Sequence, residues 1–226
     1  MNLDFYRDKI LNEKKDAFEL LCSTLSEYNK MFNLTAITQK EDIFNKHFLD
    51  SCTGESFFPV GAKVVEIGSG GGFPSLPLKI IRDDLDFTLI ESTQKKCKYL
   101  DICVDKLALK GVKVLNIRAE DGAKDKNLRE KFDCCVARAV ARMNTLSEYC
   151  LPYVRVGGRF IAYKGDADEE LKEAAKAIKV LGGETECVEK FTLCGEKRTI
   201  IVVKKVSPTP LKYPRGLGKE RKDPII

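Results

Sequence analysis

The chain has 226 residues, of which 43% are hydrophobic, so it can bury the core of one sizeable α/β domain and is not expected to be disordered. No apolar run approaches the roughly 20 residues that a membrane helix requires, and the N-terminus lacks the apolar core of a signal peptide. We therefore expect a soluble, cytoplasmic protein with no membrane partner.

The formal net charge of +5 is concentrated near the C-terminus. From Lys204 onward, seven basic residues face two acidic ones, and this stretch carries the whole excess. It is also rich in proline and glycine, which break regular structure. A basic tail of this kind favours contact with a polyanion, and a tail that serves only solubility is the alternative.

The nine cysteines contain no C-x-x-C pair, and His47 is the only histidine. A zinc site needs closely spaced ligands, so the sequence predicts no metal. Reduced thiols, mostly buried as small apolar side chains, are the expected state.

Residues 1–58 are predicted to form a helical cap. Phe18, Leu21, Leu25 and Tyr28 recur every three to four residues, which is the apolar stripe of an amphipathic helix. Nothing in this part has the pattern of a strand.

From residue 62 the pattern alternates between strands and helices. Strands are predicted at residues 63–67, 86–91, 112–117, 132–139 and 157–164, the last one after a glycine turn. Helices are predicted at residues 93–109, ended by Gly111, at 143–152 and at 167–183. Residues 186–193 and 197–205 are predicted as two strands joined by a short connection, which predicts an antiparallel pair. The alternation indicates an α/β doubly wound, mostly parallel sheet within residues 59–206, followed by a basic tail at 207–226.

The first strand runs into a glycine-rich turn in the stretch "VVEIGSGGGFPSLPL". Phe73 stands where the dinucleotide fingerprint requires its third glycine after Gly68 and Gly70, and no G-K-[ST] follows as in a P-loop. Close backbone approach without a phosphate-binding helix end suits S-adenosylmethionine. A dinucleotide and a purely structural turn remain the alternatives.

An acidic residue ends the second predicted strand. Glu91 lies 23 residues after Gly68, where a carboxylate can accept both ribose hydroxyls of an adenosine. Both NAD and S-adenosylmethionine carry this ribose, so Glu91 predicts an adenosine site without identifying the cofactor.

From about residue 31 to its end, the chain carries successive blocks that include "NLTAIT", "KHFLDS", "EIGSGGGFPSLPL", "ARAVAR" and "TPLKYPRGLGK". In these blocks it resembles the bacterial 16S rRNA guanine-N7 methyltransferases, historically the glucose-inhibited division protein B family. The family more often has aspartate where this chain has Glu66 and Glu91. The resemblance implies a class I S-adenosylmethionine-dependent methyltransferase fold, Rossmann-like, with seven strands and an antiparallel last strand. It also implies methyl transfer to N7 of a guanine in 16S rRNA of the small ribosomal subunit.

The resemblance also implies site residues. Gly68 and Phe73 would line the cofactor pocket, Ala119 and Glu120 would flank the adenine, and Arg138 would lie by the methionine end. Two ordinary alternatives remain open, a helix cap for Glu120 and a surface ion pair for Arg138.

Guanine N7 carries a lone pair and no proton, so its methylation needs no general base, and the sequence offers no obvious one. No cysteine follows a proline, as cytosine C5 methylation would require, and the amine-methylating Asn/Asp-Pro-Pro-aromatic loop is absent. We therefore expect no catalytic residue in the strict sense and catalysis by positioning.

The candidate substrate contacts are Arg142, Lys164 and His47, with Phe73 and Tyr163 as possible stacking platforms for an extruded base. For His47 a packed structural role is the alternative. The competing functions are methylation of another RNA or of a small-molecule acceptor, and RNA binding without catalysis by a module that retains the cofactor crevice. A monomer is expected.

Overall fold

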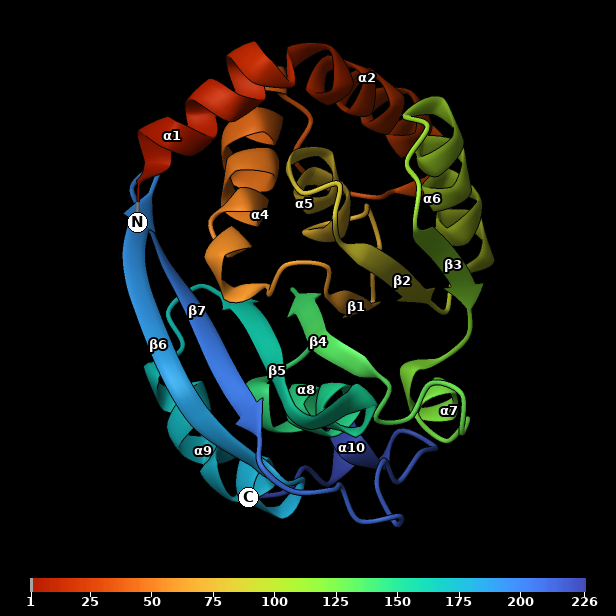
Figure 1. The fold of residues 1–226 in the computed structure, drawn as a ribbon, viewed down its shortest axis with the longest axis vertical. Coiled ribbons are helices and arrows are strands. Elements are labelled where there is room, and N and C mark those ends of the chain that lie inside the picture. The colour runs from red at the N-terminus through yellow and green to blue at the C-terminus, as the bar shows by residue number, and fades with distance from the viewer. Residues whose placement is uncertain (1) are drawn as a thin grey trace.

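A computed structural model describes residues 2–226 as seven strands in one sheet with helices on both faces (Figure 1). The spatial order is β3-β2-β1-β4-β5-β7-β6. The strands are β1 (Lys63–Ile67), β2 (Asp86–Glu91), β3 (Val112–Asn116), β4 (Phe132–Arg138), β5 (Val154–Lys164), β6 (Gly183–Leu193) and β7 (Glu196–Lys205).

Strand β1 pairs in parallel with both β2 and β4, so the strand order reverses beside it. Strand β7 is antiparallel to β5 and to β6. The predicted doubly wound sheet with an antiparallel last strand is thereby confirmed. In such sheets the ligand crevice lies beyond the carboxyl ends of the strands at the reversal, here between β1 and β4.

The N-terminal helices and those after β1 and β2 cover one face of the sheet (Figure 1). They are α1 (Leu3–Asp8), α2 (Lys15–Phe32), α3 (Lys40–Asp42), α4 (Asp50–Cys52), α5 (Ser75–Ile81) and α6 (Gln94–Lys106), with π-helical segments at Lys9–Glu13 and Ile43–Leu49. Phe18, Leu21 and Leu25 of α2 are fully buried, as the apolar stripe predicts.

The helices after β3 cover the opposite face (Figure 1). They are α7 (Ala119–Gly122), α8 (Met143–Cys150), α9 (Asp168–Val180) and α10 (Lys219–Lys222). Helix α8 is buried along its whole length because it lies between the sheet and the C-terminal segment. Each face of the sheet thus carries its own hydrophobic core, and the two cores together hold the carboxyl ends of the central strands in place.

The prediction of a glycine turn before the fifth strand is wrong. Strand β5 begins at Val154, and Gly157 and Gly158 lie inside it, where the pairing with β4 shifts register. A Cβ on Gly158 would lie 2.5 Å from the Asp133 carbonyl oxygen, so the residue must be glycine for the strands to approach. The helix before β3 also ends earlier than predicted, at Lys106, because Ala108 takes a left-handed conformation with φ of 49°.

Residues 207–226 pack against the α8 face of the sheet. Arg129 donates to the carbonyl oxygens of Thr209 and Tyr213 at 2.8 and 2.9 Å. Arg215 forms a two-pronged ion pair with the buried Glu148, at 2.8 and 3.0 Å. The basic segment is therefore tied to the fold along its length.

We expect Arg215→Ala to lower the free energy of unfolding by about 3 kcal/mol, because it leaves the 1% exposed Glu148 carboxylate without its cationic partner and with only the backbone N–H of residue 215. Urea denaturation measures this change. Lys212→Ala, which removes an exposed lysine from the same segment, is the matched control and should change stability by less than about 0.5 kcal/mol. Equal effects of the two substitutions would contradict the assigned role of the pair.

All nine cysteines are free thiols, and seven of them are buried. Burial raises the pKa of Cys103 to about 12, which suits an inert packing role. Within residues 2–226, no helix combines the length and apolarity that crossing a bilayer would require.

Candidate functional site

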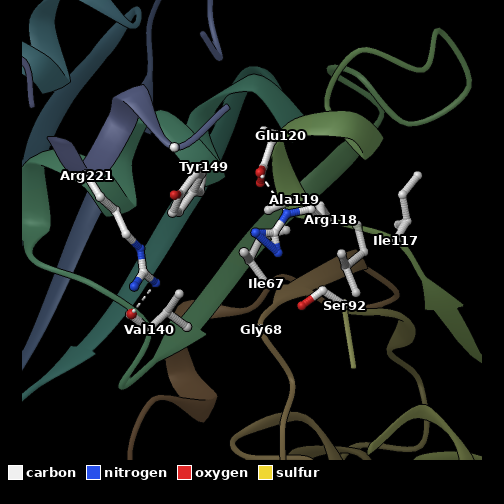
Figure 2. Close-up of a pocket in the computed structure, with 12 residues that line it drawn as sticks. Ile67, Gly68, Ser92, Ile117, Arg118, Ala119, Glu120, Val140, Tyr149 and Arg221 are labelled. Atoms are coloured by element: carbon white, nitrogen blue, oxygen red, sulfur yellow. Dashed lines mark hydrogen bonds and ion pairs between the residues drawn. The ribbon is translucent and has the colours of Figure 1, made fainter. Parts of the chain in front are cut away.

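A cavity of about 310 Å³ lies at the carboxyl ends of the central strands; we call it the first cavity (Figure 2). Its walls come from the ends of β1, β2 and β3, the loop after β4, and helices α8 and α10. They include Gly68, Ser92, Ala119, Glu120, Val140, Tyr149 and Arg221. The first cavity thus occupies the position where the strand order predicts a ligand.

Gly68, the first residue of the glycine-rich turn, lines the first cavity. Gly68 and Gly70 have φ of 69° and 52°, a conformation that side chains disfavour. A Cβ on Gly68 would lie 2.8 Å from Cγ2 of Val140. The exposed Gly68 backbone therefore offers a ligand close approach that no other residue type would allow.

Glu91 lies beneath this turn and is 6% exposed. Its two carboxylate oxygens accept hydrogen bonds from the backbone N–H groups of Gly70 at 3.0 Å and Thr93 at 2.7 Å. The carboxylate thus fixes the turn, and Ser92 is the neighbouring side chain that faces the cavity. A ribose contact by Glu91 stays a prediction.

Ala119 and Glu120 begin helix α7, directly beyond the end of β3, and both line the first cavity. The Tyr153 hydroxyl donates to the Ala119 carbonyl at 2.6 Å and holds this corner in place. Arg118 pairs with Glu120 at 3.1 Å. The placement is compatible with the adenine contacts that the resemblance implies.

Glu66, the acid two residues before the turn, is 1% exposed, and neither of its carboxyl oxygens has a hydrogen-bond partner within residues 2–226. Burial raises the pKa of this carboxyl to about 8. An unpartnered buried carboxyl beside an open glycine turn suits a ligand that brings its own donors. The amino acid end of S-adenosylmethionine carries such donors, so these residues fit that cofactor.

A second cavity, of about 470 Å³, lies beyond the ends of β4 and β5. Its lining includes Lys46, His47, Asp50, Arg138, Lys164 and Arg198. Asp50 accepts from Arg138 at 2.7 Å and from Arg198 at 3.2 Å, and so joins the two guanidinium groups. The lining also includes Glu196, so four cationic side chains, which are ion-paired, face two carboxylates, and the net positive charge of the lining suits a polyanionic ligand.

Phe73 lies outside the first cavity, 6% exposed, against the residues of the second. Its ring stacks on His47 with centroids 4.4 Å apart and planes at 14°. The Arg138 guanidinium carbon lies 5.1 Å from the same ring. The structure therefore groups Phe73, His47 and Arg138, and it separates all three from Ala119 and Glu120.

His47 is half-buried, and both of its ring nitrogens are hydrogen-bonded. A guanidinium can only donate, so Nδ1 accepts from Arg138 at 3.0 Å, and Nε2–H must donate to the Thr35 hydroxyl at 2.7 Å. Burial, helped by the nearby Arg138 charge, lowers the pKa of His47 from 6.5 to about 3. The imidazole is thus neutral and a poor base at neutral pH.

We expect the ring signals of this single histidine to show no titration near pH 6.5 in an NMR pH series. Between pH 6.5 and about 3 the unfolded chain binds a proton on the ring that the folded chain does not. Folding stability therefore falls as the pH drops through this window, and His47→Gln should reduce that fall. A midpoint near 6.5 in the folded protein would contradict the assigned environment.

The other two candidate substrate residues lie apart. Lys164 lines the second cavity, where it donates to the Ala141 carbonyl and to Glu170 at 2.6 and 2.7 Å. Arg142 is exposed, pairs with Glu173 at 2.6 Å, and lines neither cavity. The structure thus brings Lys164 and His47 to one hollow and leaves Arg142 outside it.

The segment after β4 divides the two cavities. Arg138 and Ala139 line the second cavity, whereas Val140 lines the first. Ala139 has φ of 57°, which is strained for a residue with a Cβ and is a known feature of functional sites. Consecutive residues of this segment therefore line both cavities, which places the two cavities on either side of it.

Sequence reasoning missed Asp50 and Arg198 of the second cavity, and Tyr149 and Arg221 of the first. Asp50 follows His47 by three residues, a spacing that places both on one face of a helix, so the sequence could have indicated that Asp50 lies beside His47. Arg198 arrives through the antiparallel pairing of β7 with β5, which no local pattern reveals.

The fold and the first cavity define the class as the class I S-adenosylmethionine-dependent methyltransferases. A solved SAM-dependent methyltransferase from Aquifex aeolicus superposes with a TM-score of 0.55 at 17% identity, covering 79% of this chain and 97% of that one. The family model GidB, described as rRNA small subunit methyltransferase G, matches residues 14–201.

Curated relatives extend the match over nearly the whole chain. The ribosomal RNA small subunit methyltransferase G of Lactobacillus johnsonii is 48% identical, covering 95% of this chain and 93% of its own length. The protein of the same name from Brevibacillus brevis is 45% identical over 96% and 93%. The chain belongs to the rRNA small subunit methyltransferase G family.

Proposed function

We propose that the protein transfers the methyl group of S-adenosylmethionine to N7 of a guanine in 16S rRNA of the small ribosomal subunit. The first cavity would bind the cofactor, and the second would receive the base. The observation that carries this proposal is the pair of cavities that both border the segment after β4, one with Gly68 exposed in its lining and the other with a net positive lining.

S-adenosylmethionine, when bound, supplies a methyl group on a positively charged sulfur. The protein's own residues would hold it by the Gly68 and Gly70 backbone, with Ala119 and Glu120 at the adenine. The low pKa of His47 argues against a general base at this position. A ring nitrogen with a free lone pair needs none, so orientation would supply most of the rate enhancement, to which well-oriented reactions owe about 7–11 kcal/mol.

In the second cavity, Arg138 and Lys164 would contact the RNA, and Phe73 with His47 would form its apolar wall. Lys212, Lys219 and Lys222 of the C-terminal segment are exposed, and we assign them to the phosphate backbone. We also propose that the protein acts on the small ribosomal subunit as a monomer in the cytoplasm.

The test is incubation with radiolabelled S-adenosylmethionine and small subunits from cells that lack the modification. Label should enter 16S rRNA, and subunits that already carry the modification should accept none. Label in transfer RNA or in a small molecule instead would favour the other acceptors. No transfer to any of them would leave an RNA-binding module.

A further inference from the structure

The rim of the first cavity carries an arginine that pairs with no carboxylate within residues 2–226. Arg221 of α10 donates to the Val140 carbonyl oxygen at 3.2 Å, beside the Tyr149 ring, and Figure 2 shows it across the cavity from Ser92 and Ile117. A carbonyl leaves most of the guanidinium's donors free. Arg221 is therefore available to an anionic ligand group.

The other guanidinium groups near this site are already paired. Arg118, which also lines the first cavity, bonds to Glu120 at 3.1 Å. Arg138 pairs with Asp50 at 2.7 Å and faces the second cavity. Of the two arginines that line the first cavity, Arg221 is thus the one whose charge the described chain does not balance.

The segment that carries Arg221 is held in position. Glu220, its neighbour, is fully buried, and its carbonyl oxygen accepts from the Thr145 hydroxyl of α8 at 2.8 Å. Arg215 is fastened to Glu148 of the same helix. Because both anchors lie on α8, which also supplies Tyr149 to the cavity, the Arg221 backbone is fixed relative to the wall it faces.

We propose that Arg221 binds the carboxylate at the amino acid end of S-adenosylmethionine, which makes the C-terminal segment a part of the cofactor site. The inference rests on the proposed function, because it requires an adenosyl amino acid in the first cavity. With the adenine at Ala119 and Glu120, the amino acid end lies toward Gly68 and Val140, where Arg221 is (Figure 2). A carboxylate there meets a two-pronged cationic donor.

Calorimetric titration of the full-length protein with two ligands tests this assignment. S-adenosylhomocysteine has the amino acid end, and 5′-methylthioadenosine lacks it. We expect Arg221→Ala to weaken S-adenosylhomocysteine binding by about 10- to 100-fold and 5′-methylthioadenosine binding by less than about twofold. Arg221→Lys should recover part of the loss, and Arg159→Ala, which removes an arginine of β5 that lines neither cavity, should bind both ligands as the wild type does.

Unchanged S-adenosylhomocysteine binding in Arg221→Ala would overturn the inference and leave the proposed function intact. An equal loss for both ligands would also overturn it, because Arg221 would then only shape the wall through its bond to Val140. Failure of the wild type to bind either ligand would remove the proposed function together with the inference.

Discussion

Replacing Gly68 by valine is expected to weaken S-adenosylhomocysteine binding by more than about 100-fold while the protein still folds. Gly68 has φ of 69°, and a Cβ there would lie 2.8 Å from Val140 Cγ2, so a branched side chain would both strain the turn and fill the ligand's approach. Isothermal calorimetry measures the loss, and circular dichroism reports the fold. Gly70→Val, at φ of 52°, should act in the same direction.

The chain supplies a matched control for backbone strain. Gly61 has φ of 67°, nothing lies within 4 Å of a Cβ placed on it, and it lies before β1, outside both cavities. Gly61→Val should therefore lose a similar amount of stability, about 1–3 kcal/mol, and keep full ligand binding. Wild-type affinity in Gly68→Val would mean that the cofactor binds elsewhere.

Replacing Arg138 by alanine is expected to lower methylation of the small subunit about 100-fold and to change S-adenosylhomocysteine affinity little. The guanidinium lines the second cavity, lies 5.1 Å from the centre of the Phe73 ring and pairs with the 7% exposed Asp50 side chain, so its loss removes charge from the RNA side. Single-turnover methylation and calorimetry on the same preparation separate the two effects.

Arg138→Lys keeps the positive charge but lacks the planar guanidinium. It serves as a second variant in case misfolding causes the loss of methylation in Arg138→Ala. Arg159→Ala is the control. Arg159 lies on β5, pairs with Glu186 on β6 and lines neither cavity, so this variant should methylate normally. If Arg138→Ala loses S-adenosylhomocysteine affinity by the same factor as activity, the guanidinium serves the methionine end of the cofactor instead.

Much of the fold could be predicted from local patterns. The predicted strands at residues 63–67 and 86–91 match β1 and β2 residue for residue, because both stretches are rich in the valine, isoleucine, leucine and phenylalanine that buried parallel strands favour. Gly157 and Gly158 misled the prediction of β5. Two adjacent glycines signal a turn and a close strand approach equally well, and only the approach of the Asp133 carbonyl oxygen on β4 to Gly158 decides between them.

The division of the site into two cavities could not be predicted. Arg138 turns to the second cavity because Asp50, 88 residues earlier, pairs with it. The C-terminal segment likewise packs on α8 because Arg215 meets Glu148, 67 residues away. Both contacts join residues far apart in the sequence, so neither leaves a periodicity or spacing. The sequence alone indicated a basic tail.

The most direct test of the account is chemical cleavage of 16S rRNA after methylation by the protein. Borohydride reduction followed by aniline cuts RNA only at N7-methylguanine. Unmodified small subunits treated with the wild-type protein and S-adenosylmethionine should be cut at one site, and those treated with Gly68→Val at none. Incorporation of labelled methyl groups into 16S rRNA without any cleavage would contradict transfer to guanine N7.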